Sequence, residues 1–171
     1  PCVNVLFLTH RLPYSPNRGD RIRAYFLLQH LGPLATVDVV SLVHDADEAA
    51  QVRTVEGLAH SVRIARVPRR RNQIRSLLAL PSATPTTHTM LDAPEIDAIL
   101  RRAVAEHRPD VVLAYCSGTA KWALRPPLSD IPLILDMVDV DSAKWRDLSA
   151  ASRPPLSWVY RREARVLAAF E

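Results

Sequence analysis

Three carboxylates lie close together in the second half of the chain, at Asp136, Asp139 and Asp141. The apolar residues before them are typical of a buried strand, so the carboxylates would follow its carboxyl end, where ligands bind in an open α/β sheet. Asp139 and Asp141 could hold a divalent cation, or one of them could be a catalytic or hydroxyl-binding carboxylate. The alternative is that Asp141 or Ser142 caps a helix. Capping explains only one of the three carboxylates, so we predict a site role for at least one of the three.

A second group with possible chemistry is the turn Asn17–Arg21, which lies between a predicted strand and a predicted helix. Gly19 would let the backbone approach a ligand closely, Asp20 is a suitable helix N-cap, and Arg18 and Arg21 could pair with a phosphate at the helix N-terminus. The turn has one glycine and no GK[ST] signature, which disfavours the familiar NAD and ATP sites. On its own, the turn is explained equally well as an ordinary strand-to-helix connection.

Further polar residues follow two other predicted strands. Tyr115 and Ser117 would face the same crevice, and His10 is the best placed of the six histidines because it directly follows the first strand. The other histidines are expected at the surface or at helix ends. No base lies near Cys116 in the sequence, which favours a buried inert thiol over a nucleophile. No catalytic Ser/His/Asp triad or Cys/His dyad can be recognised in the sequence.

Alternating strand and helix patterns must position these residues. Apolar runs predict strands and amphipathic spacing predicts helices. The strands are expected at Val3–Leu8, Thr36–Leu42, Ser61–Val67, Val111–Tyr115 and Leu133–Met137, and the helices at Asp20–Leu31, Ala46–Ala59, Ala93–His107, Gly118–Leu124 and Pro155–Phe170. This order predicts an α/β fold with a doubly wound, mostly parallel, Rossmann-like sheet.

The composition is that of an ordinary globular domain, with 171 residues, 48% hydrophobic and 23% charged. This length allows one domain and hardly two. The formal charge of +4 favours an anionic small molecule or membrane surface, and we expect no nucleic-acid partner. The two cysteines fit no metal or redox spacing, and neither a signal peptide nor a membrane span is visible. We expect a cytoplasmic protein, and the ends of the sequence predict a piece of a longer chain.

The segment Arg69–Leu80 interrupts the alternation, because it is first basic and then apolar, and a Pro/Thr-rich loop follows it. A short packed helix with a solvated charged start is the favoured interpretation. The alternative is a basic amphipathic element lying on an anionic membrane surface.

Taken together, three segments resemble the N-terminal domain of GT-B sugar transferases of the family-4 type. The resemblance is to the bacterial subgroup associated with exopolysaccharide and PEP-CTERM/exosortase loci, and it is carried by Phe7–Arg23, Asp136–Trp145 and Trp158–Arg165. It implies a Rossmann-like domain over residues 1–171 that binds the acceptor, and a second, C-terminal domain that binds most of a nucleotide-diphosphate sugar. Residues 1–171 would stop before the last strand of this domain and would be inactive alone.

The resemblance also implies roles for individual residues. Many relatives place a histidine at the end of the Leu133–Met137 strand. Asp139 stands in that neighbourhood here, so it is the candidate catalytic residue, together with Asp141. The substrate-binding candidates are His10, Arg18, Gly19, Asp20, Arg21, Tyr115 and Ser117. The fold needs no metal, and the donor sugar nucleotide takes the place of a cofactor. The acceptor would be a glycan or a lipid-linked molecule at the inner face of the cytoplasmic membrane.

Two other function classes stay open from the sequence. One is a non-enzymatic α/β ligand-binding or receiver-like module with an acidic pocket. The other is a metal-dependent nucleotidyl or sugar transferase that uses Asp139 and Asp141 as ligands.

Overall fold

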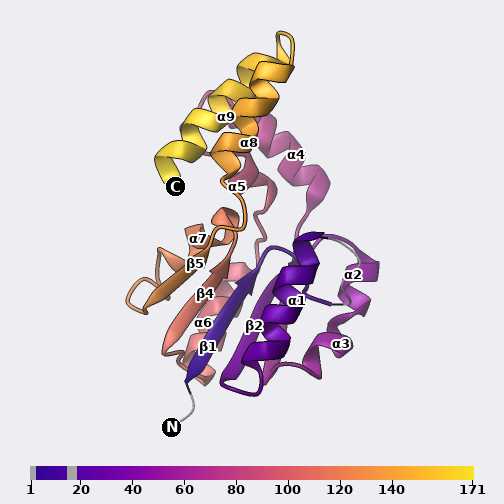
Figure 1. Ribbon diagram of the computed structural model, residues 1–171, viewed down its shortest axis with the longest axis vertical. Helices are drawn as coiled ribbons and strands as arrows, with labels where there is room; N and C mark the ends of the chain where they lie inside the picture. The colour runs from indigo at the N-terminus through magenta and orange to yellow at the C-terminus, as the bar shows by residue number, and fades with distance from the viewer. Residues whose placement is uncertain (1–2, 15–18) are drawn as a thin grey trace.

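A computed structural model describes residues 3–14 and 19–171 (Figure 1). Its centre is a five-stranded, all-parallel sheet in the order β3-β2-β1-β4-β5. The strands are β1 (Asn4–Thr9), β2 (Thr36–Val43), β3 (Ser61–Arg66), β4 (Val111–Tyr115) and β5 (Leu133–Asp136). All five predicted strands are therefore present. The sequence order reverses between β1 and β4, so the switch point of the sheet lies between these two strands.

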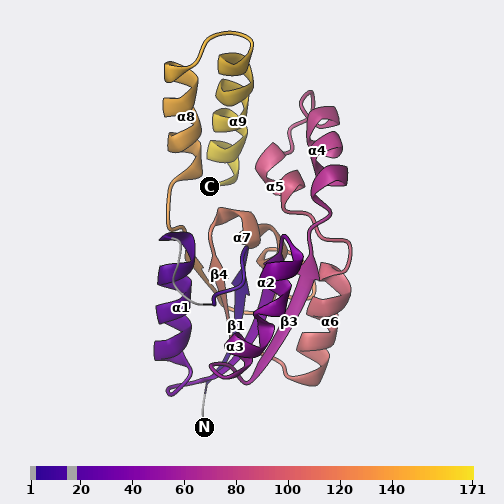
Figure 2. The same cartoon turned by 90° about the vertical axis from the view of Figure 1, so that its right-hand side faces the viewer.

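Helices cover both faces of the sheet (Figure 2). On one face α1 (Gly19–Leu31), α2 (Ala46–Ala50) and α3 (Val52–Glu56) pack around Phe7, Val39 and Leu28. On the other face α6 (Ile96–Glu106) and α7 (Ser117–Ala123) pack around Leu6, Val40 and Leu100. Successive residues of a strand point to opposite faces, which is why neighbours such as Leu6 and Phe7 enter different cores. The fold is thus the predicted Rossmann-like α/β arrangement with helices on both faces.

The helix expected over Ala46–Ala59 is divided into two. Helix α2 begins with the side chain of Asp45, which accepts the Glu48 amide hydrogen bond at 2.7 Å. It ends at Gln51, and α3 begins directly after it. Glu48 of α2 is a polar residue in the middle of the predicted helix, and its side chain is fully buried.

Four helices lie beyond the carboxyl ends of the strands and form a helical cap (Figures 1 and 2). They are α4 (Arg69–Leu78), α5 (Thr86–Met90), α8 (Asp141–Ala151) and α9 (Leu156–Phe170). The favoured interpretation of Arg69–Leu80 as a short packed helix is confirmed for the helix α4 but not for its packing, because Ile74, Leu77 and Leu78 are exposed. Helix α5 lies partly in the segment expected to be a Pro/Thr loop.

Glu163 joins α9 to α5 inside this cap. Its carboxylate is buried and accepts the amide hydrogen bonds of Thr86 at 3.0 Å and Thr87 at 2.9 Å, while Arg162 pairs with it at 2.8 Å. Burial alone would raise the pKa of Glu163, but these amide bonds outweigh it and the pKa is lowered. The carboxylate is therefore ionised at neutral pH and fixes the start of α5. Across the described residues, no helix combines the length and the apolar character needed to cross a bilayer.

Candidate functional site

A cleft of about 760 Å³ lies between the carboxyl edge of the sheet and the helical cap. The loops after β1 and β2 form one side, and α4, α5 and α8 form the other. The lining residues are Arg11, His44, Asp45, Arg69, Asn72, Gln73, Thr87, Met90, Leu91, Lys144 and Trp145. Ligands of open parallel sheets bind outside the carboxyl ends of the strands, so the position of this cleft makes it the candidate functional site.

The charge of the cleft is predominantly positive. Arg11, Arg69 and Lys144 line it, against the single carboxylate of Asp45. Asp45 is already used as the cap of α2. Arg69 and Lys144 have no ion-pair partner among the residues that the structure describes. Cations that face a cleft without an internal counter-charge favour an anionic ligand.

Asn72 contributes an unused hydrogen-bond acceptor to the same cleft. Its Nδ2 amino group donates to the carbonyl oxygens of Met90 at 3.1 Å and Asp92 at 2.7 Å. Because both carbonyls can only accept, the orientation of the side-chain amide is fixed. The Oδ1 atom is left buried and receives no hydrogen bond from the described residues. The atom is covered in this conformation, so a ligand hydroxyl or N–H would satisfy it after a small rearrangement of its surroundings.

His44 is the residue of the cleft lining whose side chain can act as a general base near neutral pH. Its Nε2 lies 2.9 Å from the backbone oxygen of His10. Since a carbonyl oxygen only accepts, the proton is on Nε2 and the lone pair of the neutral ring is on Nδ1. Burial lowers the pKa of His44, and the nearby Arg11 and Arg69 lower it further. The ring is therefore neutral at pH 7 and can accept a proton.

Trp145 gives the cleft an aromatic wall. Its ring is half-buried and packs against Tyr160 of α9, with 5.3 Å between the ring centroids and a tilt of 48°. This contact holds the indole in place on α8. Cations, one hydrogen-bond acceptor and a fixed aromatic ring in one cleft are a combination suited to a hydroxyl-bearing anionic molecule.

Comparison of the chain with protein-family models, with curated proteins and with solved structures finds no match.

The three carboxylates of the sequence analysis separate in the structure. Asp136 ends β5 and pairs with Arg23 at 2.9 Å. Asp139 is exposed and lines a different, shallow groove along α8. Asp141 is the first residue of α8 and accepts the hydroxyl hydrogen bond of Ser117 at 2.6 Å. None of the three lines the cleft described above.

The contact between Asp141 and Ser117 joins the cap to the sheet. Ser117 is fully buried at the first turn of α7, and Asp141 is at the first turn of α8. The serine hydroxyl donates to the carboxylate, and none of the described histidines pairs with it. This geometry is that of a structural link between two helix starts.

His10 and Tyr115 lie together at the switch point between β1 and β4. Their rings stack with 6.0 Å between centroids and 8° between planes. Tyr115 is only 1% exposed and also packs edge-on against Phe7. His10 supports the cleft through its backbone oxygen, which holds His44, whereas Tyr115 belongs to the core beneath it.

The residues of the first turn have different positions. Arg21 is buried, pairs with Glu48 at 3.2 Å and lies 4.4 Å from the centre of the Tyr14 ring. Gly19 begins α1 and is exposed, with nothing within 4 Å of an added Cβ. Asp20 lies within α1, one residue after its start, so it does not occupy the expected N-cap position. Arg18 lies outside the described residues.

Two of the described residues just beyond strand ends, one and two positions after the last strand residue, have left-handed backbone conformations. Cys116 after β4 has φ 76° and Val138 after β5 has φ 63°. Both are costly for residues with a Cβ, above all for the β-branched valine. Burial raises the pKa of the Cys116 thiol to about 11, so the thiol is protonated at neutral pH. This agrees with the expectation of an inert cysteine.

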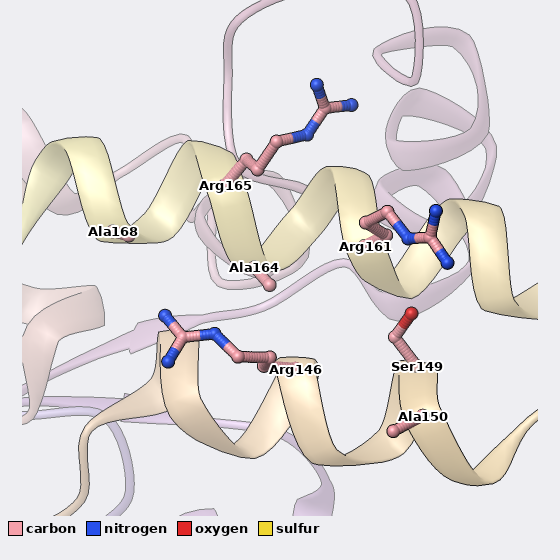
Figure 3. A pocket seen from close by; sticks show the side chains of 7 residues that line it. All are labelled: Arg146, Ser149, Ala150, Arg161, Ala164, Arg165 and Ala168. Carbon is pink, nitrogen blue, oxygen red and sulfur yellow. The ribbon is translucent and has the colours of Figure 1, made fainter.

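A smaller groove of about 420 Å³ runs between α8 and α9 (Figure 3). Its floor is made of small residues, among them Ala164 and Ala168, and its rims carry Arg146, Arg161 and Arg165. The three guanidinium groups point away from one another and do not converge on one position (Figure 3). The groove therefore lacks the convergent polar groups of the main cleft.

Sequence reasoning missed the residues that best define the cleft. The sequence predicts His44 at the surface or at a helix end, and Asn72 lies inside the segment interpreted as a short packed helix with a charged start. The buried side of α4 carries the polar residues Asn72 and Ser76, whereas its apolar residues Ile74, Leu77 and Leu78 are exposed, so the usual rule that apolar residues mark the buried side of a helix points away from Asn72.

Proposed function

We propose that this domain binds the acceptor of a sugar-transfer reaction, in which a second domain supplies the nucleotide-diphosphate sugar. The observation that carries the proposal is the cleft itself. It combines the cations Arg69 and Lys144 with the unused Asn72 acceptor at the carboxyl edge of a Rossmann-like sheet. A phosphorylated glycan or glycolipid offers both the anion and the hydroxyl donors that these groups require. The resemblance of three segments to GT-B sugar transferases supports the same function.

Within this proposal His44 accepts the proton of the attacking acceptor hydroxyl. The ring is neutral, carries its free lone pair on Nδ1 and lines the cleft. Asp139, the candidate from the sequence, lies on the α8 groove and would act only if the bound donor or the second domain brought the reacting centre there.

Binding tests the cleft directly. Titration with glucose 1-phosphate, followed by tryptophan fluorescence, should show saturable binding, and inorganic phosphate should bind more weakly because it has no sugar hydroxyls. Arg69→Ala and Lys144→Ala should each weaken binding roughly tenfold or more, as expected for a lost hydrogen bond to a charged group. Arg70→Ala is the matched control, since Arg70 is next to Arg69 on α4 but does not line the cleft. Equal affinities in all variants would contradict the proposed site.

Transfer activity distinguishes an enzyme from a binding module. The protein expressed from its whole reading frame is incubated with labelled nucleotide sugars and a bacterial lipid extract. His44→Gln should reduce the transfer rate at least about a hundredfold if His44 is the base, whereas Asp139→Asn should do so if the sequence candidate is correct. His30→Gln on α1 is the control. Ligand binding without any transfer would instead favour the non-enzymatic module.

We also propose that α4 contacts an anionic membrane surface. Ile74, Leu77 and Leu78 are 62%, 67% and 74% exposed on a helix that begins with three arginines. Exposed apolar side chains beside cations are typical of interfacial helices. Co-sedimentation with vesicles containing phosphatidylglycerol, but not with neutral vesicles, is expected, and Leu78→Ser should weaken it. Unchanged sedimentation of this variant would contradict the contact.

A further inference from the structure

A cluster of two histidines and an aspartate lies at the opposite edge of the sheet from the cleft. Asp38 is near the start of β2, His60 directly precedes β3, and His107 directly follows α6. Three segments that are far apart in the sequence thus meet at the amino-terminal edge of the strands. Nothing in the proposed sugar transfer uses these residues.

The side-chain atoms of the cluster converge. His60 Nδ1 lies 3.0 Å and His107 Nδ1 lies 2.7 Å from the two carboxylate oxygens of Asp38. One ligand atom of each of the three residues can be chosen so that all lie within 4.8 Å of one another. Ligand atoms around a four-coordinate zinc ion are about 3.3 Å apart when the metal–ligand bonds are about 2.0–2.1 Å long. The Asp38–histidine distances are already close to this value, and side-chain rotation of the exposed His60 would bring the remaining ligand atoms, now within 4.8 Å of one another, to the required spacing.

The position of Asp38 is unusual for a strand. It lies between Val37 and Val39 on a strand with a neighbour on both sides, where aspartate is disfavoured. Its side chain faces the α6 side of the sheet, as Val40 does, and is 8% exposed. Its two carboxylate oxygens face the Ser61 hydroxyl and the Nδ1 atoms of both histidines.

The exposure of the histidines leaves a path to solvent. The side chain of His60 is 59% exposed and that of His107 is 31% exposed, in contrast to the buried carboxylate. An ion can therefore enter from outside without unfolding the sheet, and a water molecule can complete its coordination. Two imidazoles and one carboxylate are a donor set of the kind that binds zinc.

From this geometry we propose that Asp38, His60 and His107 form a zinc site with one coordination position open to solvent. Each neutral imidazole binds through the Nδ1 lone pair and carries its proton on Nε2, and one Asp38 oxygen completes the protein ligands. The ion ties β2, the start of β3 and the end of α6 together. Its position at the far edge makes it independent of the cleft.

Zinc binding can be measured on the metal-free protein by calorimetry and by competition with a chromogenic chelator. We expect one equivalent to bind in the wild type and the affinity to fall at least about tenfold in both His60→Gln and His107→Gln. His30→Gln, which changes an exposed histidine on α1, is the matched control. Co²⁺ provides a second readout, because the visible absorption of the bound ion should appear in the wild type and disappear in His60→Gln.

Two results would overturn the proposal. Zinc could bind equally in the wild type and in both histidine variants, which would place the ion elsewhere, or the wild type could bind none. Either would leave the three residues as a hydrogen-bonded link only. His60→Gln keeps the test valid because the exposed His60 side chain can be replaced without opening the core. A far-ultraviolet circular dichroism spectrum equal to that of the wild type confirms this in the same experiment.

Discussion

Arg21 and Glu48 form an ion pair of 3.2 Å in which the side chains are 6% and 0% exposed. Glu48 also accepts the amide hydrogen bonds of Leu12 at 3.1 Å and His44 at 2.8 Å. One carboxylate therefore fixes the loop after β1, the end of β2 and the start of α1. Because the Leu12 and His44 amides are next to the cleft residues Arg11 and Asp45, this buried pair positions one wall of the cleft.

Arg21→Ala should therefore destabilise the protein strongly. Removing one partner of a buried pair leaves an uncompensated charge, which costs about 3–5 kcal/mol. Arg23→Ala is the control. Its pair with Asp136 has an arginine side chain that is 61% exposed, so its loss should cost about 1 kcal/mol or less. Urea unfolding followed by circular dichroism measures both. Equal losses in the two variants would contradict the structural role of Arg21.

The sheet could be predicted from the sequence because each strand carries its own signal. The apolar run of β1 and the Pro109–Asp110 pair before β4 are local, and local patterns fixed all five strands to within about two residues. The cap could be predicted only in part. The amphipathic spacing of α9 is local, but its attachment to α5 depends on Glu163 and Thr87, which are 76 residues apart.

The cleft could not be predicted from the sequence, because its lining residues come from segments that are far apart along the chain. Arg69 and Lys144 belong to separate helices, and nothing in either segment shows that they face one space. The sequence favours the Asp136–Asp141 segment as a site because its carboxylates are close together along the chain. In the structure Asp139 lines the α8 groove, whereas Asp141 accepts the hydrogen bond of Ser117. Proximity along the chain is a poor guide where a strand passes into a helix, since successive residues there point in different directions.

Because of His88, we expect the free energy of unfolding to decrease as the pH falls below about 6.5. His88 is 5% exposed, and its Nε2 has no hydrogen-bond partner among the described residues. Burial lowers the pKa of His88 from 6.5 to about 4, with Lys121 as a further cause. The folded protein thus holds the ring neutral while the unfolded chain takes up a proton below about pH 6.5. Above pH 6.5 the neutral ring costs the folded state no stability. As the pH falls from 6.5 toward 4, the free energy of unfolding decreases by on the order of 3 kcal/mol, because only the unfolded chain takes up the proton.

His88→Phe should remove this dependence, because phenylalanine does not titrate and can keep the edge-on contact with Phe170. The free energy of unfolding is measured for both proteins at about pH 7.5, above the range in which the two states differ in protonation, and at about pH 4.5, near its lower end. The variant should lose less stability between the two pH values than the wild type. His30→Gln, at an exposed position, should behave as the wild type. A loss in His88→Phe as large as in the wild type would show that His88 is not the group responsible.

Val138 tests whether the turn after β5 is strained. Its φ of 63° is unfavourable for a β-branched residue, and its side chain is 38% exposed, so little packing is lost on truncation. A left-handed non-glycine residue costs on the order of 1–3 kcal/mol, against about 0.5–1 kcal/mol for the extra freedom of glycine in the unfolded chain. Val138→Gly should therefore stabilise the protein by up to about 1 kcal/mol or leave it nearly unchanged.

The matched control for this substitution is Val140→Gly. Val140 is 54% exposed but has an ordinary φ of −83°. Glycine relieves no left-handed strain there. Its backbone freedom costs roughly 0.5–1 kcal/mol, and the preference for glycine over valine at the N-cap of α8 offsets part of this, so the variant should not be more stable than the wild type. Thermal unfolding of the two variants under the same conditions gives the difference directly. If both valines lost the same stability, the backbone of residue 138 would not be strained. If only Val138→Gly were neutral or better, the strain would be located at the end of β5, where the chain leaves the sheet for α8.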